Sequence, residues 1–220
     1  MTTPPTSAQV GRRLRNMHDK QSRIFEAAAT LFAERGFDSV TTQQISDRAD
    51  IAAGTLFRYA ASKGELLLMV YNEDFRAALE RGEREARAQR DPIKAILAVT
   101  GPIAEAANRH PTNTVVYQRE LLFGSPTDKY RSEGLALVAR LEAVLAERLA
   151  LDARARRLDS PRLDSQARLA GRSVFAVLQL AVVQPATGAH PGHNALDDLR
   201  AQITQIVAGF FASLENRRKA

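Results

Sequence analysis

The stretch "TTQQISDRADIAAGTLFRYAASKGEL", residues 41–66, contains two short helical patterns separated by only two or three residues. A helix that is stable alone in water needs roughly a dozen residues or more, and neither segment is that long. Each segment must therefore pack its apolar side against another element. This requirement predicts a small cluster of helices in which two members are short.

Local signals define the two segments. Thr41 and Gln44 have the spacing of a capping box, which begins a helix by satisfying free backbone donors. Asp50 stands at the turn, where a left-handed backbone favours Gly and tolerates Asn or Asp next best. Leu56 is expected to face inward from the second segment. Helix, sharp turn and helix, packed on a third helix at 19–35, is the arrangement that places the second helix in the major groove of DNA.

The remainder of the chain is also predicted to be helical. Apolar residues recur at i, i+3, i+4, i+7 and i+8 in the 19–35 segment, and Gly36 supplies a stop. Pro- and Gly-containing breaks separate the later segments, and no strand-like alternation competes with them. The fold class is therefore all-α, with about nine helices. The later helices are expected at 62–90, 92–109, 112–123, 128–158, 165–183 and 195–216.

Composition narrows the class of protein. The chain has no cysteine, which excludes disulfides and thiolate metal sites. Its longest apolar stretch, "VFAVLQLAVV" at 174–183, is shorter than the roughly 18 residues of a membrane span, and the start has no secretory pattern. We expect a cytoplasmic protein with no membrane association and no cofactor. The net charge of +6 permits a polyanionic partner without requiring one.

Basic residues gather near the start of the chain. Residues 1–23 carry five Lys or Arg residues, among them Arg12, Arg13 and Arg15, against the single acid Asp19, a net charge of +4. A flexible basic arm at 1–18 would lie well beside DNA phosphates. A solvated leader without a DNA contact is an equally good interpretation of the same residues.

The segment "RIFEAAATLFAERGFDSVTTQQISDRADIAAGTLFRYAASKGELL" resembles the N-terminal domain of the TetR family of bacterial transcriptional repressors. The matching elements are "AA…LFAERGFD", "TT…I…A", "GTLFRY" and "SKGEL". The chain departs from the family at Asp50, where Gly is usual, and at Ala52 and Ala53, where Ser and Lys are common. The resemblance implies a helix-turn-helix DNA-binding domain at 19–64 and a helical effector-binding and dimerisation domain at 65–220.

Matched positions and residue chemistry together assign the expected DNA contacts. Thr41, Thr42 and Gln43 would meet phosphates at a helix N-terminus, and Arg58 would read a guanine edge. Phe57 either contacts a thymine methyl group or packs in the core. The alternative for Arg58 is that it is an ordinary solvated surface arginine. The full predicted DNA-binding set is Thr41, Thr42, Gln43, Ala53, Thr55, Phe57, Arg58, Tyr59 and Lys63, the last two as phosphate contacts.

Two further surfaces are predicted from the helical body. A mostly apolar set with polar members has the composition of a small-molecule pocket and, equally, of a core: Tyr71, Phe75, Ile103, Tyr117, Phe123, Phe175 and Gln179. The last two long helices are apolar on wide faces, and a two-fold dimer would supply the two half-sites of a palindromic operator. The predicted homodimer interface is Gly171, Val174, Leu178, Ile203, Ile206 and Phe210.

The leading interpretation is a sequence-specific DNA-binding transcriptional regulator, a repressor released from a palindromic operator by a small, largely apolar effector. The alternative is a helical architectural DNA-binding or protein-scaffolding protein without a small-molecule ligand. An enzyme is not expected, because the chain has no nucleophile elbow, P-loop or HExxH motif. We expect solvent-exposed or structural roles, and not metal binding, for His110 and for the loop histidines His190 and His193.

Overall fold

Nine helices and no strand make up the part of the chain that the computed structural model describes, which is residues 7–219, with side chains described for residues 17–216. The predicted all-α class is therefore confirmed. The helices are α1 (Ser7–Arg35), α2 (Thr42–Arg48), α3 (Ala53–Leu56), α4 (Lys63–Arg87), α5 (Pro92–Asn108), α6 (Pro111–Phe123), α7 (Lys129–Ala155), α8 (Leu163–Thr187) and α9 (Ala195–Lys219).

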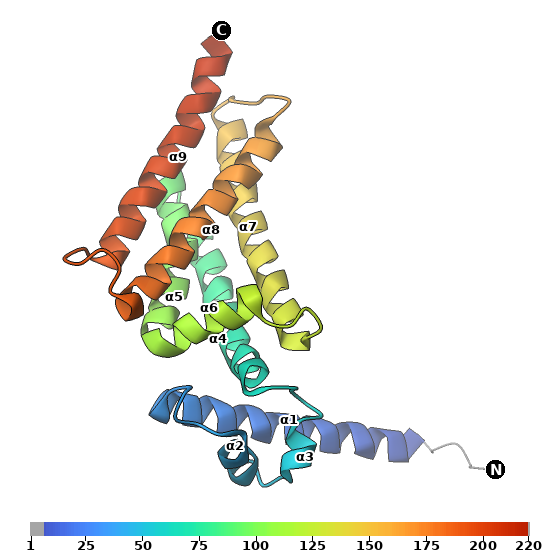
Figure 1. The fold of residues 1–220 in the computed structure, drawn as a ribbon. Helices are drawn as coiled ribbons and strands as arrows, with labels where there is room; N and C mark the ends of the chain where they lie inside the picture. The colour runs from blue at the N-terminus through green and yellow to red at the C-terminus, as the bar shows by residue number, and fades with distance from the viewer. Residues whose placement is uncertain (1–6, 220) are drawn as a thin grey trace.

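The small unit of α1–α3 lies at one end of the molecule, and α5–α9 form the larger body (Figure 1). The long helix α4 leads from the first to the second. Helices α7, α8 and α9 run beside one another along the body, and α6 crosses between the body and the small unit. This arrangement puts α4 and α6 where a change in the body can reach the small unit.

The predicted breaks between helices are found close to the predicted positions. Gly36 has φ +75°, a left-handed conformation that ends α1. Asp91 caps α5 by accepting from the Lys94 backbone N–H at 2.8 Å, and prolines stand at the first positions of α5 and α6. The helix boundaries thus follow from local chemistry that can be read along the chain.

The start of α1 differs from the prediction. The helix begins at Ser7, so residues 7–18, which were expected to be a flexible arm, are helical and continuous with the 19–35 segment. The low frequency of helix breakers after Pro5 accounts for the extension. The side chains of Arg12, Arg13 and Arg15 lie outside the described residues, so their predicted contact with DNA stays a prediction.

The buried residues form two clusters, and α4 contributes to both. The first cluster combines α1–α3 with the N-terminal half of α4, from Leu66 to Val70, and includes Tyr117 and Tyr130 from the body. The second contains the rest of α4 and the interior of α5, α7, α8 and α9. The predicted boundary between residues 64 and 65 therefore falls inside one continuous helix, whose two halves are packed in different cores.

Helix α8 is long and apolar enough, by length and composition, to cross a membrane, a result that the shorter stretch at 174–183 did not predict. Core helices of folded domains often have the same length and composition. Here Val174 and Leu178 are buried in the body, where α8 packs against α7 and α9.

Candidate functional site

The helix-turn-helix begins with the predicted capping box. The Thr41 hydroxyl accepts from the Gln44 backbone N–H at 3.2 Å, and the Gln44 side chain accepts from the Thr41 N–H at 2.9 Å. These reciprocal bonds satisfy two donors that the first turn of α2 would otherwise leave free. Ile45 and Ser46 are buried beneath this turn. The N-terminus of α2 is consequently fixed, with Thr41 and Gln43 exposed and Thr42 half-buried.

Asp50 adopts the left-handed conformation predicted for the turn, with φ 51°. Arg23 of α1 donates to both the Asp50 carbonyl and its carboxylate, each at 3.3 Å. The pair is exposed, so its energetic contribution is small. Its geometric effect is to tie the turn between α2 and α3 to α1, a role for Arg23 that no local sequence signal indicated.

Helix α3 is only four residues long, and Leu56 anchors it in the core without solvent exposure. The chain then continues through a turn in which Phe57 is 51% exposed and Arg58 is exposed. Phe57 is therefore a surface residue, not a core residue. Ala53, Thr55 and Tyr59 are each half-buried at the edge of this surface. The exposed Phe57 and Arg58 thus stand side by side on the outer side of the helix-turn-helix.

Lys63 forms bonds within the chain, and the phosphate contact predicted for it stays a prediction. Its ammonium group donates to the carbonyls of Phe37 and Val40, both at 2.9 Å, and lies 4.2 Å from the centre of the Phe37 ring. These bonds satisfy carbonyls in the loop between α1 and α2 and join that loop to the start of α4. The sequence pattern gave no sign of them, because the partners lie more than 20 residues away.

A cavity lies in the body between α4, α5, α6, α7 and α8. The space between protein atoms is about 550 Å³, part of it open to solvent, and six of the seven predicted pocket residues line it: Tyr71, Phe75, Ile103, Tyr117, Phe175 and Gln179. The rings of Tyr71 and Tyr117 are stacked with centroids 5.7 Å apart. A mostly apolar lining with a few polar groups is typical of a ligand site. Contact of these residues with a ligand stays a prediction.

The prediction for Phe123 is wrong. Phe123 is the last residue of α6, is 82% exposed and does not line the cavity. It lies six positions after Tyr117, which turns its side chain about 120° around the helix from that of Tyr117. The cavity is also lined by polar residues that were not predicted, namely Asp74, Thr114 and Gln118. Thr114 and Gln118 are spaced at i+4 on the side of α6 that carries Tyr117, a spacing that would have identified them.

Five of the six residues predicted for the dimer interface are buried within the chain, which contradicts their prediction, whereas Ile206 is half-buried and its interface role stays a prediction. Val174, Leu178, Ile203 and Phe210 are buried within the chain, and Ile206 packs against the same core. Gly171 is covered by α7, since an added Cβ would lie 2.9 Å from the Glu142 carbonyl oxygen. Apolar faces that pack inside a protomer and those that pack between protomers have the same composition, so the pattern alone selected the inner face.

Asn113 links the cavity wall to the DNA-binding unit. This residue of α6 is buried, donates from Nδ2 to the Phe32 carbonyl at 2.8 Å, and accepts at Oδ1 from the Phe37 N–H at 2.8 Å. Its neighbour Thr114 lines the cavity. The end of α1 is therefore held by a helix that also forms one wall of the cavity.

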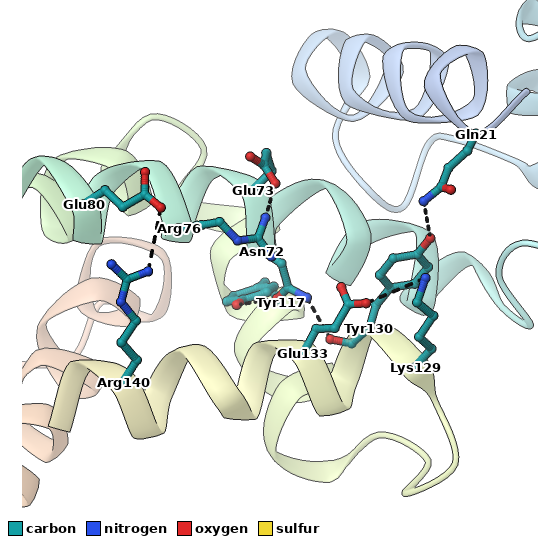
Figure 2. A network of polar contacts seen from close by, with 10 residues as sticks. All are labelled: Gln21, Asn72, Glu73, Arg76, Glu80, Tyr117, Lys129, Tyr130, Glu133 and Arg140. Carbon is teal, nitrogen blue, oxygen red and sulfur yellow. Dashed lines mark hydrogen bonds and ion pairs between the residues drawn. The ribbon is translucent and has the colours of Figure 1, made fainter. Parts of the chain in front are cut away.

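A second connection runs through buried polar groups, shown in Figure 2. The Tyr117 hydroxyl donates to Asn72 Oδ1 at 3.0 Å, and Asn72 Nδ2 donates to the Tyr130 carbonyl at 2.7 Å. Gln21 of α1 then donates to the Tyr130 hydroxyl at 3.3 Å. Burial raises the pKa of Tyr117, so its hydroxyl keeps its proton and remains a donor. The contacts run from a cavity-lining side chain to α1.

Gly134 permits this connection. A Cβ at this position of α7 would lie 2.7 Å from Asn72 Oδ1 and 2.7 Å from a methyl carbon of Leu121. A larger residue would have to displace both side chains, so glycine leaves room for the bond between Tyr117 and Asn72. Among the residues with described side chains, no group of three or more His, Cys, Asp or Glu could hold a metal ion.

Comparison with known proteins agrees with this geometry. Residues 24–70, which run from α1 to the first part of α4, match the family of bacterial regulatory proteins described as the tetR family. The HTH-type transcriptional repressor KstR of Mycobacterium tuberculosis is 30% identical over 105 residues, 48% of this chain and 48% of that protein. The chain thus aligns with about half the length of the curated relatives it matches.

Solved structures extend the likeness to the body. FadR of Thermus thermophilus, a TetR-family transcriptional repressor in complex with lauroyl-CoA, has a TM-score of 0.69 and 25% identity, covering 86% of this chain and 93% of that one. FadR of Bacillus subtilis, in complex with stearoyl-CoA, has a TM-score of 0.63 and 19% identity, covering 86% and 98%, and shows the shared fold. Membership in a family of regulators agrees with the expectation that the chain is not an enzyme. Residues 24–70 therefore form a domain of the tetR family of bacterial regulatory proteins, and the chain as a whole shares its fold with a solved TetR-family repressor.

Proposed function

We propose that this protein is a DNA-binding transcriptional repressor whose hold on a palindromic operator is controlled by a small, largely apolar effector. The observation that carries the proposal is the exposure of Phe57 and Arg58 directly after the buried anchor Leu56. A 51% exposed phenylalanine beside an exposed arginine presents both apolar and basic surface to the outside. The major groove, about 12 Å wide, admits a short helix supported from behind by α1.

The proposed contacts follow from the chemistry of this surface. Arg58 pairs with a guanine edge through two parallel N–H groups, and Phe57 packs on a thymine methyl group. The exposed Thr41 and Gln43 meet phosphates where α2 offers free backbone N–H groups. Tyr59, Thr55 and Ala53 lie at the border of the contact, while Lys63 acts indirectly by holding the loop between α1 and α2.

Two copies of the chain would be joined through the outer faces of α8 and α9. The exposed side of α9 carries small or short residues at helical spacing beside the longer, exposed Gln205: Ala201, Thr204, Ala208, Gly209 and Ala212. An added Cβ at Gly209 meets nothing, so the surface is open to a second helix. On α8, Leu169 is 66% exposed and Leu180 is 44% exposed. Pairing these faces would bury both leucines in a four-helix bundle.

The effector is proposed to occupy the cavity beside Tyr71 and Tyr117. Its lining is mainly aromatic and aliphatic, which favours an apolar molecule. The similarity to FadR of Thermus thermophilus, whose structure holds lauroyl-CoA, supports an effector with a long apolar chain. The cavity also favours this function over the alternative of an architectural or scaffolding protein, for which a filled helical body is expected.

The link between effector and DNA is proposed to run through α6. A ligand that displaces α6 must move Asn113 relative to Phe32, and must disturb the bond between Tyr117 and Asn72. Both changes act on the small unit of α1–α3. A ligand with higher affinity for the displaced arrangement shifts the population away from the DNA-binding one. The two DNA-binding units of a dimer would then lose the spacing that the operator requires.

Fluorescence anisotropy of labelled duplexes tests this proposal. The DNA flanking the gene is the natural first target, since a cytoplasmic regulator of this kind often binds beside its own gene. Saturable binding that survives excess unrelated duplex supports specific repression. Equal affinity for every duplex would instead favour the architectural alternative.

A further inference from the structure

Two glutamines in the cavity wall carry buried polar atoms that have no hydrogen-bond partner among the described residues. They are Oε1 of Gln118 on α6 and Nε2 of Gln179 on α8, and both residues line the same cavity. Buried polar side-chain atoms are nearly always paired in folded proteins, because an unpaired one loses its bonds to water without replacement. Two such atoms in one cavity indicate groups that a ligand completes.

The two atoms require different kinds of hydrogen-bond partner. An amide oxygen accepts a hydrogen bond, whereas an amide nitrogen donates one. The ligand must therefore bring an O–H or N–H group to Gln118 and an oxygen or nitrogen lone pair to Gln179. Two other polar groups of the wall are already paired, since the Thr114 hydroxyl donates to the Ala107 carbonyl at 2.8 Å and the Tyr117 hydroxyl donates to Asn72 Oδ1 at 3.0 Å.

The charged residues that line the cavity disfavour an ionised carboxylic acid as the ligand. No Lys, Arg or His lines the cavity, and its one carboxylate is Asp74. Asp74 pairs with Arg109 at 3.4 Å, with both side chains about half exposed, so this pair stands at the solvent side. A carboxylate buried deeper would lose its hydration without meeting a cation and would be repelled by Asp74.

We propose that the effector is an uncharged hydrophobe carrying a hydroxyl or amide group, held by Gln118 and Gln179, and that the protein rejects the corresponding free carboxylic acid. This inference rests on the proposed effector function of the cavity. It adds the chemical class of the buried group: neutral, with both a donor and an acceptor.

Three probes with ten-carbon alkyl chains separate the alternatives: 1-decanol, decyl methyl ether and decanoate. Each is titrated at pH 8, where the acid is ionised, to displace the fluorescent hydrophobe N-phenyl-1-naphthylamine from the full chain. Decanol should displace the dye at a concentration at least about tenfold lower than decanoate. The ether, which accepts but cannot donate, should require more than decanol, because it leaves Gln118 unpaired.

The double variant Q118L/Q179L keeps the volume of the side chains and removes both polar groups. It should bind the dye, yet respond to decanol and the ether at concentrations within a factor of about two. Gln166→Leu is the matched control, since Gln166 on α8 also has a buried unpaired oxygen but does not line the cavity. This control should keep the full preference for decanol, and circular dichroism confirms that each variant is folded.

Two results overturn the inference while leaving the proposed function in place. One is dye displacement by decanoate at or below the decanol concentration. The other is an unchanged preference for decanol in Q118L/Q179L. Failure of the dye and all three probes to bind would overturn both the inference and the proposed effector function, so the two failures can be told apart.

Discussion

Asn113 on α6 donates from its side-chain amide to the Phe32 carbonyl at 2.8 Å, across 81 residues of sequence. The same side chain accepts from the Phe37 N–H, so it holds both sides of the bend that follows α1. The residue next to it, Thr114, faces the cavity. One turn of α6 therefore lines the cavity and contacts the unit of α1–α3 at once.

Replacement of Asn113 by Ala should lower the free energy of unfolding and reduce the effect of the effector on DNA binding. Both partners would be left unpaired in a buried place, which costs about 1–3 kcal/mol in the free energy of unfolding. Urea denaturation measures this loss. The effector should also release less DNA from the variant, which anisotropy with and without effector detects.

Asn108→Ala provides the comparison, because the Asn108 side-chain oxygen is buried but has no partner. This variant should lose little stability and keep its response to effector. Full effector response in Asn113→Ala, at a ligand concentration that saturates the cavity, would show that Asn113 does not transmit the change.

Lys63→Met should lower the free energy of unfolding and leave the salt dependence of DNA binding unchanged. Removing the ammonium group leaves the Phe37 and Val40 carbonyls without their donor, at a cost of about 1–3 kcal/mol in unfolding free energy. A lysine on a phosphate would instead contribute about 0.9 to the slope of log K against log salt. Exposed Lys94 supplies the control variant Lys94→Met. A fall of about one unit in the slope of log K against log salt would show that Lys63 contacts a phosphate, as the sequence predicts.

Gly209→Arg should separate the proposed dimer without unfolding the chain. Gly209 lies on the exposed stripe of α9 with open space around it, so an arginine fits the monomer but not a close helix pair. Size-exclusion chromatography with light scattering should report a dimer for the parent chain and a monomer for the variant. Ala136→Arg, on the exposed side of α7, should stay dimeric. A parent chain that is monomeric at micromolar concentration would refute the proposed interface.

The parts of the molecule that could be predicted are those set by neighbours in sequence. The capping box at Thr41, the left-handed Asp50 and the stop at Gly36 depend only on the residues beside them. Periodicity likewise located the helices and their apolar sides. Six cavity residues were found because a ligand cavity and a core use the same apolar chemistry.

The parts that could not be predicted depend on which side of an apolar helix meets which partner. Val174 and Phe210 are equally suited to a core and to an interface, and the structure places both in the core. Lys63 carries a charge suited to a phosphate contact, but its ammonium group donates to carbonyls that are distant in sequence. Asn113 is one polar residue among many until α6 folds against the end of α1.

Arg58→Ala should cost about 1–3 kcal/mol in affinity for the specific operator if the guanidinium reads a base, while affinity for unrelated duplex changes much less. Arg87→Ala, which removes an exposed arginine from the far end of α4, should leave both affinities unchanged. Equal losses on specific and unrelated DNA would assign Arg58 to a phosphate. No loss on either would remove it from the contact.

Selection of bound sequences from a pool of random duplex DNA tests the central claim most directly. A dimer that presents Phe57 and Arg58 from two related copies should enrich an inverted repeat, with half-site centres spaced by about 34–36 Å or a multiple. Enrichment should be lost in Arg58→Ala. Recovery of a pool with no common sequence, from protein that still binds duplex, would contradict the account.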